Sequence, residues 1–296
     1  MGLDINAIQF LLRARKNGLQ FGKVLTIGRL NLDVFPAKIC ELLQQHGLSD
    51  ALFRNKLPEK GAVGGFADDL FRALGATSVH SLDASDYEGA TLVHDLNQPI
   101  PPTWRDGYDV VYDGGTLEHV FNFPIALRNC MELVRPGGEL FLHAPGNNWL
   151  GHGFYQFSPE LFFRAFSAEN GFQMTEMIAY AVGPHDRWYR VSDPQAIRSR
   201  VELISYSLIC LLVQAKKTNS VEIFQKMPMQ SDYSVMWEEA AGQAAAPDGS
   251  PGIFVRWMRR RLPKVAHLFK AVNTGLKFYR SHSLRNRRFF TPVEKD

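Results

Sequence analysis

The chain contains little cysteine and no long hydrophobic run. Three cysteines, Cys40, Cys130 and Cys210, are spread over 296 residues, and each lies among periodically spaced apolar residues. Buried free thiols are therefore favoured over disulfides or metal ligands, and a reducing, cytoplasmic compartment is expected. The longest plain apolar run, Leu208 to Val213, is far shorter than the ~20 residues needed to cross a bilayer.

Several catalytic signatures are also missing. The chain has no Cys-x-x-Cys, no His-x-x-x-His and no Gly-x-Ser-x-Gly, so neither a metal site nor a hydrolase nucleophile is predicted. A nicotinamide site would place G-x-G-x-x-G after the first strand and an acid about 20 residues later. Here the first strand ends at Gly28, and the candidate acid, Asp83, lies 55 residues further on. The first cations follow the N-terminal apolar stretch instead of preceding it, which is unlike a signal peptide.

The charges are unevenly distributed along the chain. The net charge is +3, but residues 251–296 carry 12 Lys+Arg against 2 Asp+Glu, a net of +10. Residues 1–250 carry 21 Lys+Arg against 28 Asp+Glu, a net of −7. A segment rich in small residues, 241–252, is typical of a linker between the two. The function of the basic tail is therefore considered separately from that of the acidic body.

The stretch from Tyr108 to Pro145 has the pattern of a strand–helix–strand unit. A short apolar run at 110–112 stops at an Asp-Gly-Gly sequence, as buried parallel strands do. Apolar residues then follow helical spacing until an Arg-Pro-Gly-Gly sequence ends the helix, and a second apolar strand follows. Ligands of open α/β sheets lie beyond the carboxyl ends of the strands, so residues 113–119 and 143–148 are expected at the working edge.

A resemblance to a known family is carried by two motifs in this stretch, D-V-V-Y-D-G-G-T-L-E-H-V and L-V-R-P-G-G-E-L-F-L-H-A-P. They resemble the fourth and fifth strands of class I S-adenosylmethionine (SAM) dependent methyltransferases, and the resemblance covers roughly residues 20–215. It implies transfer of a methyl group from SAM to an acceptor. It also implies a seven-stranded Rossmann-like sheet of order 3-2-1-4-5-7-6, with strand seven antiparallel.

Periodicity alone predicts alternating strands and helices, which is typical of a doubly wound α/β sheet. Helices are predicted near residues 4–17, 37–46, 66–74, 122–134 and 159–169. Strands are predicted at 23–28, 79–85, 90–96, 110–112, 140–143, 174–182 and 206–216. The interpretation divides the chain into an N-terminal helix packing on the sheet (1–22), a methyltransferase-like domain (23–218), a linker (219–252) and a basic amphipathic helical tail (253–296).

The loop after the first strand departs from the family pattern. The family has G-x-G-x-G there, whereas this chain has only Gly28, followed by R-L-N-L-D. A second glycine-rich run at 61–65 leads into the next predicted helix. We interpret the loop as split by an insertion at about 29–60, with Gly28, Gly61 and Gly64 contacting the cofactor. A helix start after such a turn offers free N–H donors to a carboxylate. The alternative is a flexible loop that no longer binds the cofactor.

The resemblance implies further cofactor contacts at the strand ends: Asp83, Ala84, Asp95, Leu96, Asp113 and Gly114. Asp83 closes the second strand, where one carboxylate can accept hydrogen bonds from both ribose hydroxyls; the alternative is a turn cap. Asp95 corresponds to the acid that receives the adenine amino group, or it forms an Asx turn before the following proline. Asp113 lines the cofactor or serves as a turn acid.

Methyl transfer from a sulfonium is an in-line displacement that requires alignment, exclusion of water and sometimes a base. Catalytic candidates at the working edge are His119, His152 and Tyr155, because a neutral His can act as a base near pH 7. Alternatively, His119 braces the helix and His152 bonds the backbone. The aromatic-rich loop that contains His152 favours a small molecule or sugar as acceptor.

The tail has apolar residues at helical spacing with Arg and Lys between them. Docking on the chain's own body, or contact in an oligomer, is ranked first. Contact of residues 253–280 with an anionic membrane surface is ranked second and nucleic acid third. The oligomeric state is left open. For the whole chain, the alternative to an enzyme is a non-catalytic scaffold that kept the fold and lost the cofactor.

Overall fold

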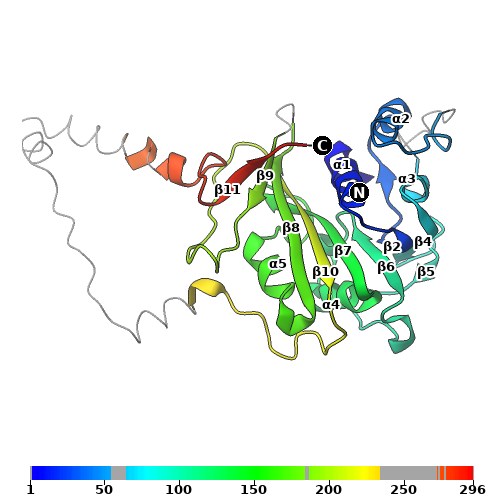
Figure 1. Ribbon diagram of the computed structural model, residues 1–296. Coiled ribbons are helices and arrows are strands. Elements are labelled where there is room, and N and C mark those ends of the chain that lie inside the picture. The colour runs from blue at the N-terminus through cyan, green and yellow to red at the C-terminus, as the bar shows by residue number, and fades with distance from the viewer. Residues whose placement is uncertain are drawn as a thin grey trace, which may run out of the picture.

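A nine-stranded sheet forms the centre of the computed structural model (Figure 1), which describes residues 2–54, 65–183, 187–233, 272, 274–276 and 278–295. In chain order its strands are β2 (Gly22–Ile27), β4 (Ala76–Asp83), β5 (Leu92–Val93), β6 (Tyr108–Asp113), β7 (Val134–Asn147), β8 (Phe172–Ala181), β9 (Trp188–Val191), β10 (Ile209–Lys217) and β11 (Phe290–Val293). A separate parallel pair is formed by β1 (Gly2–Leu3) and β3 (Asn31–Leu32).

The strand order in the large sheet is β11-β9-β8-β10-β7-β6-β2-β4-β5. The strands from β5 to β7 are parallel, and β10 is antiparallel to both of its neighbours, β7 and β8. The predicted count of seven strands is wrong, because β9 and β11 extend the sheet beyond β8. Each of these two strands has four residues, which is too short for alternation to identify a strand.

Helices cover both faces of the sheet, and strand side chains alternate between two apolar layers. The helices are α1 (Ile5–Lys16), α2 (Pro36–Gln45), α3 (Asp68–Ala73), α4 (Phe123–Leu133) and α5 (Pro159–Ala165). Leu25 and Val111 belong to the layer with α4 and α5, whereas Val24 and Val110 belong to the layer with α1, α2 and α3. Because both faces are covered, the central strands are apolar runs without polar alternation.

The helices begin where the sequence supplies caps. Asp4 precedes α1, and its Oδ1 accepts a hydrogen bond from the Ala7 N–H at 2.8 Å. Both α2 and α5 begin at a proline, Pro36 and Pro159, whose missing N–H needs no partner in the first turn. All five helices lie within the predicted segments or within a residue of them.

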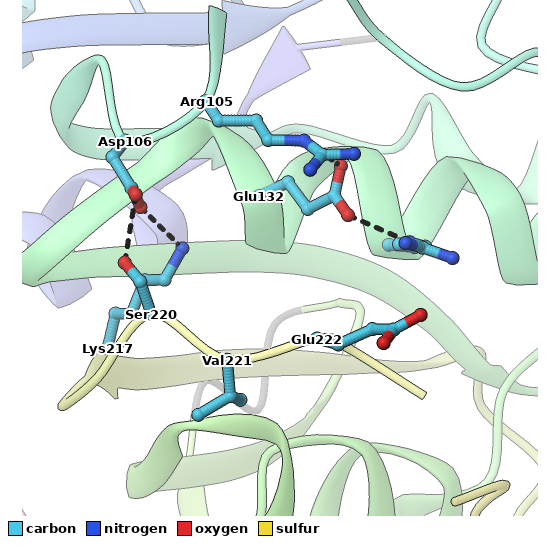
Figure 2. Close-up of a pocket in the computed structure, with 8 residues that line it drawn as sticks. Arg105, Asp106, Glu132, Lys217, Ser220, Val221 and Glu222 are labelled. Carbon is cyan, nitrogen blue, oxygen red and sulfur yellow. Dashed lines mark hydrogen bonds and ion pairs between the residues drawn. The ribbon is translucent and has the colours of Figure 1, made fainter. Parts of the chain in front are cut away.

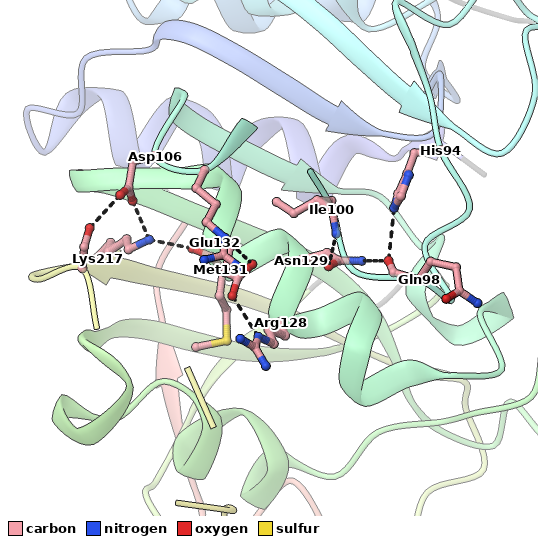
Figure 3. A network of polar contacts seen from close by, with 11 residues as sticks. His94, Gln98, Ile100, Asp106, Arg128, Asn129, Met131, Glu132 and Lys217 are labelled. Atoms are coloured by element: carbon pink, nitrogen blue, oxygen red, sulfur yellow. Dashed lines mark hydrogen bonds and ion pairs between the residues drawn. The ribbon is translucent and has the colours of Figure 1, made fainter. Parts of the chain in front are cut away.

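An ion pair between a buried lysine and an exposed aspartate fastens the amino edge of the parallel strands. The Lys217 side chain is 3% exposed, and its Nζ lies 2.8 Å from Asp106 Oδ1 and 3.1 Å from the Met131 carbonyl oxygen. Ser220 Oγ donates to the second Asp106 oxygen at 2.8 Å. These contacts join β10, α4 and the turn before β6, and Figure 3 shows them from close by. They also form one side of a groove of about 540 Å³ (Figure 2).

The end of the chain packs on the body of the protein. β11 pairs antiparallel with β9, with Phe290 opposite Val191, and Phe290 is buried. Arg13 of α1 donates to the Glu294 carbonyl oxygen at 3.1 Å. Figure 1 shows this last strand in red beside β9. This part of the predicted helical tail is therefore a strand docked on the chain itself, and residues 253–280 lie mostly outside the described residues.

The beginning of the predicted linker also belongs to the body. Ile223 is 1% exposed, and the Ser231 N–H donates to Glu160 Oε1 of α5 at 2.8 Å. Residues 219–233 are therefore packed against the domain instead of forming a free linker. Residues 234–252 lie outside the described residues.

The predicted insertion contributes to the core. It contains α2 and the fully buried Leu32. Its two ends lie side by side, because the Leu32 N–H donates to the Gly65 carbonyl oxygen at 2.8 Å and the Ala67 N–H to the Leu30 carbonyl oxygen at 2.9 Å. The two halves of the split loop thus meet at the base of the insertion. Two predicted contacts lie outside the described residues, Gly61 and Gly64.

Candidate active site

The ends of β2 and β4 bring Gly28 and Asp83 together. A Cβ at Gly28 would lie 3.9 Å from Asp83 Oδ2 and 2.9 Å from Thr116 Oγ1, and the φ of Gly28 is +75°. Glycine is therefore required at this position. Asp83 is half-buried, and its Oδ1 accepts a long hydrogen bond, 3.4 Å, from the Ser85 N–H, while Ala84 is exposed. Asp83 Oδ2 thus lies near Gly28 where the two strands end.

A buried acid organises the loop after β6. Asp113 is 1% exposed, and its Oδ1 accepts the Thr116 N–H at 2.9 Å. The Thr116 hydroxyl in turn donates to the Ile27 carbonyl oxygen at 2.9 Å, which ties the loop to β2. Burial raises the pKa of Asp113 to about 7, against backbone donors that lower it. Asp113 therefore serves as the turn acid, and the buried Gly114 and Gly115 lie where the loop borders the neighbouring cavity.

The first residues of the insertion lie beside the ends of β2 and β6. Leu30 is 3% exposed, and its methyl carbons lie 2.9 Å from the position of a Cβ at Gly114 and 4.0 Å from that at Gly28. Arg29 donates to the Glu88 carbonyl oxygen in the loop after β4. A ligand that crosses the ends of β2 and β6 must therefore pass beside Leu30.

A buried asparagine holds the segment after β5 (Figure 3). Asn129 of α4 is 1% exposed, and its Nδ2 donates to the Gln98 carbonyl oxygen at 2.8 Å. Asp95 is exposed, and its Oδ1 accepts both the backbone and the side-chain N–H of Asn97, at 2.9 and 2.8 Å. These hydrogen bonds lower the pKa of Asp95. Asp95 thus forms the Asx turn that was the alternative to adenine binding, and Leu96 is buried.

A cavity of about 250 Å³ lies at the ends of β6, β7 and β8. Gly114 and Gly115 lie in its wall. The other polar residues that line it are Asp4, Asp33, Glu118, His143, His152 and Tyr180. This is the edge at which open α/β sheets bind ligands. Of the three predicted catalytic residues, only His152 lines the cavity.

Three polar side chains in the cavity form a chain of hydrogen bonds. The Tyr180 hydroxyl donates to Asp4 Oδ2 at 2.8 Å, and His143 Nε2 lies 2.7 Å from the Tyr180 oxygen. Because Tyr180 gives its proton to Asp4, His143 Nε2 must donate, which leaves a lone pair on Nδ1. Burial lowers the pKa of His143. His143 is therefore a neutral imidazole with a fixed tautomer, which is the state a general base requires.

Glu118 and His152 line the same cavity, and His119 lies next to them without lining it. Their ligand atoms lie within 4.8 Å of one another, and His152 Nε2 is 3.4 Å from Glu118 Oε1. Glu118 is 1% exposed, and burial, followed by the charge of Asp113, raises its pKa to about 8. Burial and the neighbouring His152 lower the pKa of the His119 imidazole. The predicted pair of histidines is thus brought together around a buried acid.

Tyr155 does not take part in this arrangement. Its hydroxyl donates to the Phe121 carbonyl oxygen at 2.7 Å, and its ring stacks on Phe157 with the ring centroids 6.2 Å apart. The hydroxyl therefore fixes the loop against the 3-10 turn that precedes α4. We withdraw Tyr155 as a catalytic candidate.

Sequence reasoning missed Asp4, Tyr180 and Glu118 as site residues. Asp4 is recognisable only as a helix cap, and Tyr180 is one residue of an apolar strand, so no local signal joins them to His143. Glu118 lies next to His119 in the Leu-Glu-His-Val motif, which is the one signal that was available. The Glu118-His119 pair, a few residues after Asp113 at the strand end, could have suggested a metal-binding cluster.

Comparisons with known proteins give similarity in structure alone. No known family matches the sequence, and no curated protein matches it. The solved structures that resemble this chain include methyltransferases. One is 1,6-didemethyltoxoflavin-N1-methyltransferase of Burkholderia thailandensis with S-adenosylhomocysteine bound, at 13% identity and a TM-score of 0.37, covering 72% of this chain and 77% of that chain.

Two further structures show the same degree of similarity. A proposed SAM-dependent methyltransferase of Listeria monocytogenes is 13% identical with a TM-score of 0.38, covering 72% of this chain and 100% of its own. A proposed methyltransferase of Bacillus halodurans is 12% identical with a TM-score of 0.39, covering 72% and 99%. Such low values give no support for a function, which must be inferred from the strand order and the site. Among the described residues, no helix is long and apolar enough to cross a membrane.

Proposed function

We propose that this protein transfers a methyl group from SAM to an acceptor bound in the cavity at the ends of β6, β7 and β8. The observation that carries the proposal is the pairing of two adjoining sites. Asp83 and Gly28 meet at the ends of β4 and β2, and the cavity begins at Gly114, one strand further along the sheet. A cofactor crossing these strand ends would bring its reactive methyl to the mouth of the cavity.

The cofactor half of the site uses a carboxylate and a glycine. Asp83 Oδ2 can accept hydrogen bonds from ribose hydroxyls, which explains an acid at this strand end. Gly28 allows the close approach of Thr116 and the positive φ that turn the chain beside Asp83. Leu30 lies along the path between Gly28 and Gly114 and would contact the methionine part of the cofactor.

The acceptor half of the site supplies alignment and a base. The sulfonium is already an activated leaving group, so catalysis requires an aligned nucleophile and a route for its proton. His143 has a lone pair on Nδ1 and is held by Tyr180 and Asp4, and it is therefore the favoured base. His152, which also lines the cavity, and His119, whose ring lies beside that of His152, remain candidates. The modest size of the cavity favours a small molecule or a sugar unit over a folded macromolecule.

Calorimetry with S-adenosylhomocysteine tests the proposal. The intact protein is expected to bind one equivalent, and Asp83→Ala to weaken binding about 10- to 100-fold, because hydrogen bonds to a charged group contribute about 1.5–3 kcal/mol. Asp86→Ala is the matched control, since this acid lies three residues further along the same loop. Absence of binding by the intact protein would favour the non-catalytic scaffold, with Leu30 filling the cofactor's place.

A further inference from the structure

We infer that Glu118, His119 and His152 form a binding site for a divalent transition-metal ion in the wall of the acceptor cavity. Their ligand atoms lie within 4.8 Å of one another. Among the described residues, no other group of three or more His, Cys, Asp or Glu side chains comes this close together. The sequence predicts no metal site, because His119 and His152 are 33 positions apart and share no motif. The fold joins them by placing the loop after β7 against the turn after β6.

A second observation points to a missing cation. Glu118 is 1% exposed, and its Oε2 has no hydrogen-bond partner among the described residues. Glu118 Oε1 has one neighbour, His152 Nε2 at 3.4 Å, which is long for a hydrogen bond. A buried carboxylate with an unpaired oxygen is costly unless a charge compensates it. A metal ion between Glu118 and the two imidazoles would supply that charge.

The backbone holds the carboxylate in place. The Glu118 carbonyl oxygen accepts the N–H groups of Phe154 and Tyr155, at 2.8 and 3.3 Å. The loop that carries His152 is therefore fastened directly to the residue that carries the acid. Gly153 has a φ of +72°, and a Cβ there would lie 2.7 Å from the same Glu118 carbonyl oxygen. This close approach of two backbones brings His152 back over Glu118.

The donor set selects the class of ion. Two imidazole nitrogens and one carboxylate suit Mn²⁺, Fe²⁺, Co²⁺ or Zn²⁺ and do not suit Ca²⁺ or Mg²⁺, which prefer oxygen ligands. Ligand distances of about 2.0–2.2 Å would require neighbouring donor atoms to approach to about 3–3.5 Å. His119 is exposed and the His152 side chain is 36% exposed, so both rings have room to rotate inward.

Three protein ligands leave coordination positions open. Glu118 and His152 line the cavity, so these positions face the space in which an acceptor would lie. An acceptor hydroxyl bound to a divalent ion loses its proton more readily. This catalytic role of the metal ion rests on the proposed function. The oxygen would form a bond to the methyl carbon as the carbon–sulfur bond breaks, S-adenosylhomocysteine would leave, and the hydroxyl proton would pass to His143 Nδ1. The acceptor class is then a small molecule methylated on oxygen.

Cobalt binding tests the site without any acceptor. The full-length protein is treated with EDTA, desalted and titrated with CoCl₂, and the visible absorption of protein-bound Co²⁺ is followed. One equivalent is expected to bind. Glu118→Gln and His152→Gln should each weaken binding about tenfold or more, because even partners that only orient metal ligands have effects of that size. His46→Gln at the end of α2 is the matched control and should bind as the intact protein does.

Two results would overturn the inference. One is the absence of a Co²⁺ spectrum with the intact protein, and the other is equal binding by the intact protein and both variants. Circular dichroism melts of the variants serve as the control that each variant is folded. S-adenosylhomocysteine calorimetry on the same samples separates the two proposals. Cofactor binding without Co²⁺ binding refutes only the metal site, and Co²⁺ binding without cofactor binding refutes only the methyltransferase.

Discussion

Replacing Glu118 by Gln is expected to stabilise the metal-free protein at alkaline pH and to change little near pH 4. Burial raises the pKa of Glu118 in the folded chain to about 8, whereas an exposed Glu in the unfolded chain has a pKa of about 4.3. Below pH 4 both states hold the proton, so no difference arises. As the pH rises toward 8, only the unfolded chain releases its proton, and the folded state loses stability relative to a neutral side chain.

The size of the effect follows from the width of this pH window. Each unit of difference in pKa corresponds to about 1.4 kcal/mol, so the upper limit is about 5 kcal/mol. The charge of the neighbouring Asp113 contributes to the raised pKa of Glu118, and the two carboxyl groups titrate together. We therefore expect Glu118→Gln to stabilise the protein by about 2–3 kcal/mol above pH 8. For a domain of this size, that corresponds to a rise of roughly 5–10 °C in the Tm.

Thermal melts from pH 4 to 9 in EDTA measure the effect. The Tm difference between Glu118→Gln and the intact protein should grow steadily from pH 5 to pH 8 and then level off. Glu222→Gln, which changes an exposed acid, should give no such trend. A Tm difference that is the same at every pH would show that Glu118 is ionised in the folded protein throughout, and would refute the reasoning.

Three further substitutions test how the site is supported. Lys217→Met should destabilise the protein by about 1–2 kcal/mol in urea unfolding, because the buried Met131 carbonyl oxygen loses its donor while the exposed Asp106 can be hydrated; no change would show that these contacts are not closed in solution. Asn129→Ala should lower stability by about 1–3 kcal/mol and increase amide exchange at 96–100, whereas unchanged exchange would contradict its anchoring role. Leu30→Ala should destabilise by about 2–5 kcal/mol, yet leave S-adenosylhomocysteine affinity within severalfold. Binding gained only in that variant would show that Leu30 blocks the cofactor.

The elements of the fold that could be predicted from sequence are those long enough to repeat their apolar pattern several times. Helices such as α1 and α4, and long buried strands such as β10, repeat their apolar pattern often enough to be identified. The strand order came from a resemblance to a family, and two added strands were missed. Both β9 and β11 are short, and β11 lies in a segment whose basic and apolar residues also fit a helix.

Candidate site residues could be predicted only where a single residue at the end of a strand suggests the role by itself. Gly28 and Asp83 were predicted because each closes a strand of the parallel sheet, and their role in binding stays a prediction. For Asp113 two roles were left open, cofactor lining and turn acid, because burial depends on packing that a sequence does not show. His143, Tyr180 and Asp4 are joined by the tertiary fold alone, across three elements that are distant in the chain.

A crystal structure of the protein with S-adenosylhomocysteine bound tests the central claim most directly. The nucleoside is expected across the ends of β4, β2 and β6, with its ribose hydroxyls donating to Asp83 and its sulfur facing the cavity that His143 lines. A structure grown at saturating ligand that shows no nucleoside there, with the Leu30 side chain filling the space between Gly28 and Gly114, would contradict the account.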